Sequence, residues 1–119
     1  MINEWESEPD YVDWESHGLK CEIRRVEKFG HLCGYVSVPA GHPLYGKHYN
    51  NVEIAVHGGL TYSDNGKNDA WVFGFDCGHV GDLIPALDYI FRKMGNGTYK
   101  NIAYVRAECE KLAEALADV

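Results

Sequence analysis

The alternation of apolar and polar residues predicts β-structure over the first two thirds of the chain. Residues 20–27 and 31–38 each have the composition of a strand, and the Phe29-Gly30 pair between them supplies a turn, so we expect a β-hairpin. In residues 52–57 apolar and polar side chains alternate strictly. This period of two predicts a third, half-buried strand.

The next segments predict a further strand and a turn. Gly58-Gly59 interrupts the pattern, and residues 60–62 either continue the third strand or form a short new one. Residues 64–69 are polar and predict a turn. Residues 70–75 are almost wholly apolar, which is typical of a central strand that is buried on both faces.

Helical periodicity appears only in the last third of the chain. Apolar residues at helical spacing predict a first helix from residue 83 to 94, with Asp82 as its cap and glycines at its end. A second helix is predicted over residues 99–117, with Thr98 as its cap. Its apolar positions recur every three or four residues, so one face should pack on the sheet.

This order of elements predicts an α+β fold, because strands come first and helices last. We expect an antiparallel sheet of about four to five strands with two C-terminal helices packed on it. The 119 residues are the usual size of one domain, so residues 1–119 are expected to form one domain, with mainly strands in 20–76 and helices in 83–117. Alternating βαβ units are absent, which argues against a doubly wound nucleotide-binding fold.

The negative charge is concentrated at the N-terminus. The formal net charge is −7, and the first fifteen residues contain six acids and neither Lys nor Arg. Without a basic surface to displace phosphate counterions, binding to a nucleic-acid backbone is not expected. Residues 1–16 are interpreted either as a solvated acidic leader or as an acidic-aromatic arm that binds a partner, since Trp5, Tyr11 and Trp14 lie among the acids.

Cysteine spacing and the absence of targeting segments predict a cytoplasmic protein. Cys21, Cys33, Cys77 and Cys109 form no C-x-x-C pair, so reduced, buried cysteines are expected. The N-terminus is acidic where a secretory signal would be basic and then apolar. No run of 18 apolar residues occurs, so we expect no association with a membrane through a spanning helix.

The first candidate site is His57-Gly58-Gly59 together with Thr61 and Tyr62. Paired glycines let the backbone approach a ligand closely and can aim N–H groups at an anion. In that interpretation His57 is an acid, a base or a hydrogen-bond donor. The structural alternative is a β-bulge or tight bend in which His57 is hydrogen-bonded locally.

The second candidate is the Asp76-x-x-His79-x-x-Asp82 sequence, which directly follows the apolar strand. Imidazole and carboxylate groups together suit a divalent metal, held by Asp76, His79 and Asp82, or a general acid–base pair. The structural alternative is that Asp82 caps a helix and Asp76 anchors a turn. If the strands that end at His57 and Asp76 are neighbours, the two candidates meet at one sheet edge, with His57, Asp76 and His79 as catalytic groups.

The loop over residues 40–50 is the third candidate. His42, Tyr45 and Lys47 offer stacking surfaces and hydrogen-bond donors to a ligand, although such side chains are also common in ordinary ordered loops. Cys77 lies beside acids that disfavour its thiolate. We therefore interpret Cys77 as a buried structural residue.

Four strings in the chain resemble a known family: GHPLYG (41–46), VHGGLTYS (56–63), WVFGFDCGHVGD (71–82) and YVRAECEKLAEAL (104–116). The family consists of short proteins of unassigned activity that are encoded in phage and prophage genomes. The resemblance implies an accessory protein in the bacterial host cytoplasm that counters host defence. The stretch DNGKNDA between the second and third strings is short, so any function of a longer insert would be absent here.

Three functions fit these features. The first is a homo-oligomeric binder that sequesters a small nucleotide-derived molecule with its glycines, histidines and aromatic residues. The second is a small hydrolase that acts on a nucleotide or phosphodiester through the His/Asp cluster, with or without a divalent metal. The third is an inhibitor that binds a protein through the acidic N-terminal arm.

Overall fold

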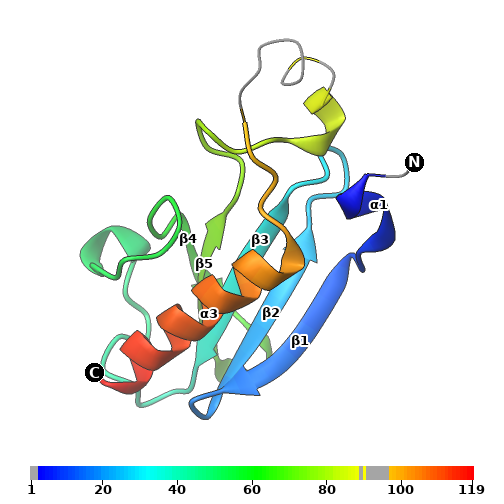
Figure 1. Cartoon of the computed structure of the whole chain (residues 1–119). Helices are drawn as coiled ribbons and strands as arrows, with labels where there is room; N and C mark the ends of the chain where they lie inside the picture. Colours follow the sequence, from blue (N-terminus) through cyan, green and yellow to red (C-terminus); the bar gives the residue numbers. More distant parts are fainter. Residues whose placement is uncertain (1–2, 89, 91–96) are drawn as a thin grey trace.

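A computed structural model of the protein describes residues 3–88, 90 and 97–119. It contains a five-stranded antiparallel sheet with one long helix across one face (Figure 1). This confirms the predicted α+β class and the number of strands. In spatial order the strands are β1 (Tyr11–Ser16), β2 (Leu19–Arg25), β3 (Leu32–Val38), β5 (Trp71–Asp76) and β4 (Tyr62–Asn65). Within the described ranges the α-helices are α1 (Glu4–Ser7) and α3 (Ile102–Ala117), and 3-10 turns lie at Tyr49–Asn51, Lys67–Asp69 and Pro85–Leu87.

The predicted hairpin is confirmed as the antiparallel pair β2–β3. Gly30 has a φ of 87°, a left-handed conformation that glycine adopts without steric cost. Its N–H donates to the carbonyl of Val26 at 2.8 Å, which closes the turn. The predicted central strand is also confirmed, because β5 lies between β3 and β4.

The core lies between the sheet and α3. Phe73 and Phe75 of β5 are buried together with Leu112 and Leu116 of α3, as the three- and four-residue spacing of α3 predicts. All four cysteines are free and buried, which confirms that expectation. Burial raises the pKa of the Cys21 and Cys33 thiols to about 11, so both remain protonated at neutral pH.

The prediction of a strand over residues 52–57 is wrong. This segment has no strand pairing, although Val52 is buried and Ile54 and Val56 pack partly against the core. An alternating pattern reports only that every second side chain is buried. Here the segment packs on the core from outside the sheet, and the new strand starts later, at Tyr62.

Only one long helix lies among the described residues. Of the predicted first helix, residues 85–87 form a single 3-10 turn, and residues 89 and 91–96 lie outside the described part of the chain. Asp82 caps no helix, because its carboxylate accepts the N–H of His79 instead. Thr98 does not cap α3 either. That cap is Asn101, whose side-chain oxygen accepts the N–H of Tyr104 at 2.8 Å.

The N-terminal segment is part of the fold, so its interpretation as a solvated leader is wrong. β1 pairs with β2 over its whole length, from Tyr11 opposite Arg24 to Ser16 opposite Leu19. Backbone pairing of this kind anchors the segment to the sheet. Among the described residues, no helix has the length and apolar character that spanning a bilayer requires.

Candidate functional site

The site is centred on Asp82, which lies in the turn that follows β5. The N–H of Asp82 donates to the carbonyl of His79, and Asp82 also forms a parallel bridge with Thr98. Thr98 donates its N–H to Gly81, and its carbonyl accepts the N–H of Leu83. These bonds hold the turn against the segment that leads into α3.

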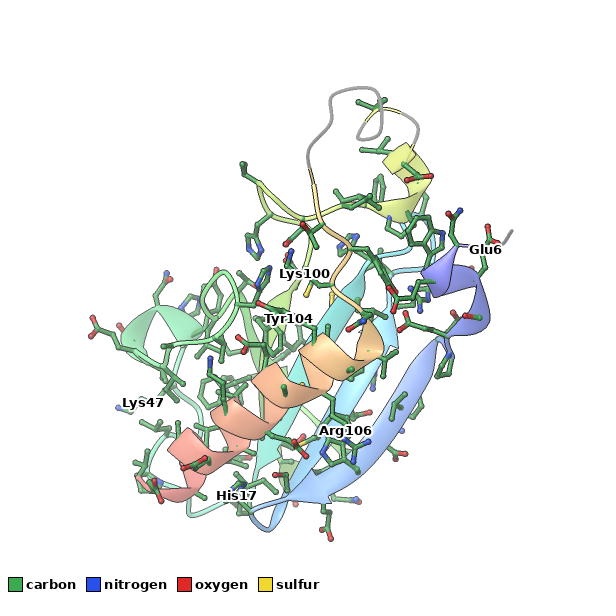
Figure 2. The ribbon with its side chains drawn as sticks, viewed as in Figure 1. Glu6, His17, Lys47, Lys100, Tyr104 and Arg106 are labelled. Carbon is green, nitrogen blue, oxygen red and sulfur yellow. The ribbon has the colours of Figure 1, made fainter. Side chains whose placement is uncertain are left out.

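This backbone pairing brings two side chains from the start of α3 to the site. Lys100 follows Thr98 by two residues, and the cap at Asn101 sets the first turn of the helix that carries Tyr104. Figure 2 shows Lys100 and Tyr104 near one another at this end of α3. The ammonium of Lys100 lies 5.8 Å from the centre of the Tyr104 ring.

Asp82 is a buried carboxylate, 2% exposed, that is surrounded by hydrogen-bond donors. Its oxygens lie 2.8 and 2.9 Å from Nε2 of His57 and 3.2 Å from Nζ of Lys100. Burial by itself raises the pKa of Asp82. The hydrogen bonds from His57, the His79 backbone and Lys100 outweigh burial and hold the pKa below its ordinary value. Asp82 is therefore ionised at neutral pH.

His57 joins Asp82 to Tyr104. Its Nδ1 lies 2.7 Å from the Tyr104 hydroxyl, and the two rings are nearly perpendicular at 89°. An ionised carboxylate only accepts hydrogen bonds, so the proton must be on Nε2 of His57. In the neutral imidazole, Nδ1 then accepts the proton of the Tyr104 hydroxyl. We call these three residues the triad: a carboxylate, an imidazole and a hydroxyl in hydrogen-bonded series.

His79 lies beside the triad. Its Nδ1 is 3.4 Å from an oxygen of Asp76 and 3.7 Å from Oδ2 of Asp82. Gly58 is needed for this approach, because a Cβ there would lie 2.4 Å from the His79 ring. The N–H of Gly59 donates to the carbonyl of Val56 within a turn.

One divalent metal ion is within geometric reach of three side chains. Ligand atoms of His57, His79 and Asp82 all lie within 4.8 Å of one another, and two imidazoles with one carboxylate are common ligands of zinc. The metal ligands predicted from the sequence were Asp76, His79 and Asp82, so the structure puts His57 in the place of Asp76. However, Lys100 already places a positive charge 3.2 Å from Asp82, and a metal dication beside it would be repelled. The donor set therefore suits proton transfer better than metal binding.

The loop over residues 40–50 is not brought to this site. Nε2 of His42 lies 2.8 Å from the carbonyl of Leu116 near the end of α3, and the Tyr45 ring packs near Trp71. The carbonyl of Lys47 accepts the indole N–H of Trp71. Figure 2 shows Lys47 well separated from Lys100 and Tyr104. These contacts give the loop a structural role at the other end of α3.

Thr61 and Tyr62 are engaged along the edge of the sheet rather than in the triad. The N–H of Thr61 donates to Gly74 and continues the pairing of β4 with β5. The Tyr62 ring packs edge-on against Tyr35, with 5.5 Å between ring centres. Of the predicted residues, the structure thus gathers His57, Gly58, His79, Asp82 and, at the margin, Asp76.

Lys100, Tyr104 and His31 were missed by the sequence reasoning. Lys100 precedes the cap of α3 and Tyr104 lies in its first turn, so no helical spacing in the sequence related the two residues. His31 is close to the same turn, since a Cβ on Gly78 would lie 3.0 Å from its ring. Burial lowers the pKa of His31, which favours the neutral imidazole. Cys77 is 1% exposed, as expected of a structural residue.

Comparisons with protein-family models, curated proteins and solved structures return no match for this chain. The functional argument therefore depends on the chemistry of the site itself.

Proposed function

We propose that the protein is a small acid–base hydrolase that acts on a nucleotide or a related small phosphate ester. The observation that supports this proposal is the triad, in which hydrogen bonds of 2.8 and 2.7 Å join Asp82, His57 and Tyr104 in series. Tyr104 is 37% exposed, so the open end of the series is in contact with solvent. A carboxylate that orients an imidazole, which in turn contacts a hydroxyl, is a common arrangement for proton transfer in hydrolysis.

The triad suggests a route for the proton. A water that attacks the phosphorus atom gives a proton to the Tyr104 oxygen while the Tyr104 proton passes to Nδ1 of His57. The imidazolium formed in this way lies against the ionised carboxylate of Asp82, which stabilises its charge. As the P–O bond to the leaving group breaks, Nδ1 of His57 returns its proton to the Tyr104 oxygen, and the proton on that oxygen passes to the leaving oxygen, so both products are released and the triad is restored.

The Tyr104 hydroxyl is well suited to relay a proton and poorly suited to be a free phenolate. Burial, followed by the nearby charge of Glu108, raises the pKa of Tyr104 above its ordinary value. A phenolate that persists between steps is therefore disfavoured, whereas a hydroxyl that receives one proton as it loses another carries no net charge. Lys100, beside the ring, provides positive charge for an anionic substrate.

The test is to incubate the protein with a panel of linear and cyclic nucleotides and to analyse each sample by chromatography before and after heat denaturation. A new product that requires the protein supports the proposal. The proposal is contradicted if no nucleotide in the panel gives a new product; a nucleotide that disappears and returns intact on denaturation has been bound without turnover.

Two variants address the triad directly. Tyr104→Phe and His57→Gln are each expected to lower kcat by about 10²- to 10⁴-fold, the usual contribution of general acid–base catalysis. Tyr45→Phe is the matched control, because this tyrosine packs near Trp71 away from the site. Its activity should equal that of the wild type. Turnover that is lost on adding a chelator would contradict the metal-free mechanism.

A further inference from the structure

The face of the sheet opposite α3 contains a hollow of about 570 Å³. We call it the sheet hollow. Its floor is formed by Arg24, Tyr35, Tyr62 and Val72, and Lys20 and Lys67 lie among its other lining residues. Its volume is within the range of about 300–1,000 Å³ that is usual for small-molecule sites. None of its lining residues belongs to the triad.

Strand alternation explains why this face differs from the core. In β5, Phe73 and Phe75 are buried on the side of α3, so Val72 and Gly74, which alternate with them, face the other way. The same alternation in β2 buries Cys21 and leaves Lys20 exposed. Figure 1 shows α3 lying across one face only, and the sheet hollow is on the other.

A glycine creates the aromatic floor of the sheet hollow. Gly74 is the pairing partner of both Tyr35 on β3 and Tyr62 on β4. A Cβ at Gly74 would lie 2.6 Å from Cδ1 of Tyr35, so only glycine lets the Tyr35 ring extend across β5. The Tyr35 and Tyr62 rings meet edge to face, at 81°, and Tyr62 is 40% exposed. Aromatic surface is therefore available to a planar ligand.

Arg24 adds a cationic plane beside this floor. Its guanidinium lies 5.7 Å from the centre of the Tyr35 ring, and Glu22 holds it with a 3.0 Å ion pair. Glu22 also accepts the hydroxyl proton of Tyr11 at 2.6 Å. The carboxylate of Glu22 is thus already occupied by two donors, so it does not repel an anionic ligand as a free carboxylate would.

Lysines supply the remaining charge. Lys67 is exposed in the connection between β4 and β5, and in the part of the chain that the structure describes no carboxylate pairs with it. Lys20 lies 4.0 Å from the carboxylate of the exposed Asp13. Glu15 is the remaining acid in the lining. When these lysines are weighed against the acids in the lining, positive charge remains available at the side of the sheet hollow where Lys67 lies.

We propose that the sheet hollow binds a mononucleotide, with its base on the Tyr35–Tyr62 floor and its phosphate at Lys67. Stacking on aromatic side chains suits any nucleobase, and a lysine ammonium suits a phosphate. An uncharged aromatic molecule would leave Lys67 without a partner. A long polyanion is disfavoured by the net charge of −7. This site is independent of the triad, and either proposal can fail without the other.

The test is an NMR titration of the full chain with the four common nucleoside 5′-monophosphates, with adenosine and with ribose 5-phosphate. At least one monophosphate should shift the backbone amides of Tyr35, Tyr62 and Lys67. Adenosine should bind about tenfold more weakly than its monophosphate at low salt, since it lacks the charge. Ribose 5-phosphate should bind more weakly too, since it lacks the base. Chromatography of each sample after the titration separates binding from turnover.

Two variants separate the contribution of base stacking from the contribution of the lysine charge. Tyr62→Leu should weaken the binding of the monophosphate and of adenosine by the same factor, about 5- to 150-fold, which corresponds to the loss of one stacked base. Lys67→Ala should weaken the binding of the monophosphate alone, so that its affinity falls to that of adenosine. Lys28→Ala, in the exposed β2–β3 turn, is the control and should bind like the wild type.

Three outcomes would overturn the proposal. One is that no monophosphate shifts these amides at millimolar concentration in the wild-type chain, a result that needs no variant. Another is that the shifts occur around His57 and Tyr104 instead of the sheet hollow. The third is that Tyr62→Leu and Lys67→Ala, both folded by their NMR spectra, bind as the wild type does.

Discussion

The carboxylate of Glu8 accepts a hydrogen bond from the backbone N–H of Ile102, at 2.9 Å and 94 positions later in the chain. Ile102 is the first residue of α3, where backbone N–H groups lack partners within the helix and a negative charge is favourable. The same carboxylate accepts the hydroxyl proton of Tyr99 and lies 3.5 Å from Arg25. The N-terminal segment thereby holds the end of α3 that carries the site.

Replacing Glu8 should therefore destabilise the fold. In Glu8→Ala the Ile102 N–H loses its acceptor, and Arg25, whose side chain is 10% exposed, keeps Asp10 as its one ionic partner among the described residues. We expect the free energy of unfolding to fall by about 2–3 kcal/mol, measured by urea denaturation. Glu27→Ala, in the exposed turn between β2 and β3, should change it by less than about 0.5 kcal/mol. Equal losses in the two variants would contradict this role for Glu8.

The contact between Glu8 and Ile102 also determines how the hypothesis of a protein-binding inhibitor must be tested. Deleting residues 1–16 would remove β1 and the Glu8 contacts together, so loss of function would not separate a binding arm from an unfolded protein. Substitution of exposed side chains, such as Asp13→Asn on β1, is the appropriate test of a partner-binding surface.

The stabilising effect of Asp82 should depend on pH. Its pKa is lowered in the folded state, so the ionised form stabilises the fold. That contribution is complete above the unfolded-state pKa of about 4 and is lost as the pH falls through the folded-state pKa. The difference in unfolding free energy between wild type and Asp82→Asn should be largest near neutral pH and shrink below about pH 4. Urea denaturation across this range measures it, and a difference that grows on acidification would contradict the assignment.

Gly34 should not tolerate a side chain. A Cβ there would lie 2.5 Å from the Phe75 ring and 2.6 Å from the sulfur of Cys109, and both residues are buried. Gly34→Ala should lower the free energy of unfolding by about 1–3 kcal/mol, because the core has no room to absorb the methyl group. Ser37→Ala, on the opposite face of the same strand, is the control. A stable Gly34→Ala protein would show that α3 is less closely packed than the structure indicates.

Gly58 should be required for the position of His79. Gly58→Ala forces both a φ of 69° on alanine and a Cβ 2.4 Å from the imidazole. Gly41→Ala is a matched control, since its φ of 96° imposes a similar backbone cost with nothing within 4 Å. Both variants should lose about 1 kcal/mol or more of stability. Only Gly58→Ala should also shift the NMR signals of the His79 ring, and identical spectra in that region would contradict the expectation.

Local patterns in the sequence predicted the parts of the fold that depend on neighbouring residues. The β2–β3 hairpin follows from two alternating stretches around Gly30, and α3 follows from apolar residues spaced three and four apart. In both cases the physical constraint acts within one element or across one short turn. Residues 52–57 show the limit, because their alternation is satisfied by packing on the core without a neighbouring strand.

The site depends on contacts that no local pattern contains. The sequence alone predicted His57, His79 and Asp82 as candidate site residues, since imidazoles and a carboxylate lie in glycine-rich segments. Only the tertiary structure placed His57 against Tyr104, 47 positions away, and replaced the expected helix-capping role of Asp82 with a set of charged hydrogen bonds. The physical reason is that a buried carboxylate takes its donors from whatever elements the fold brings beside it, and sequence spacing does not record which elements those are.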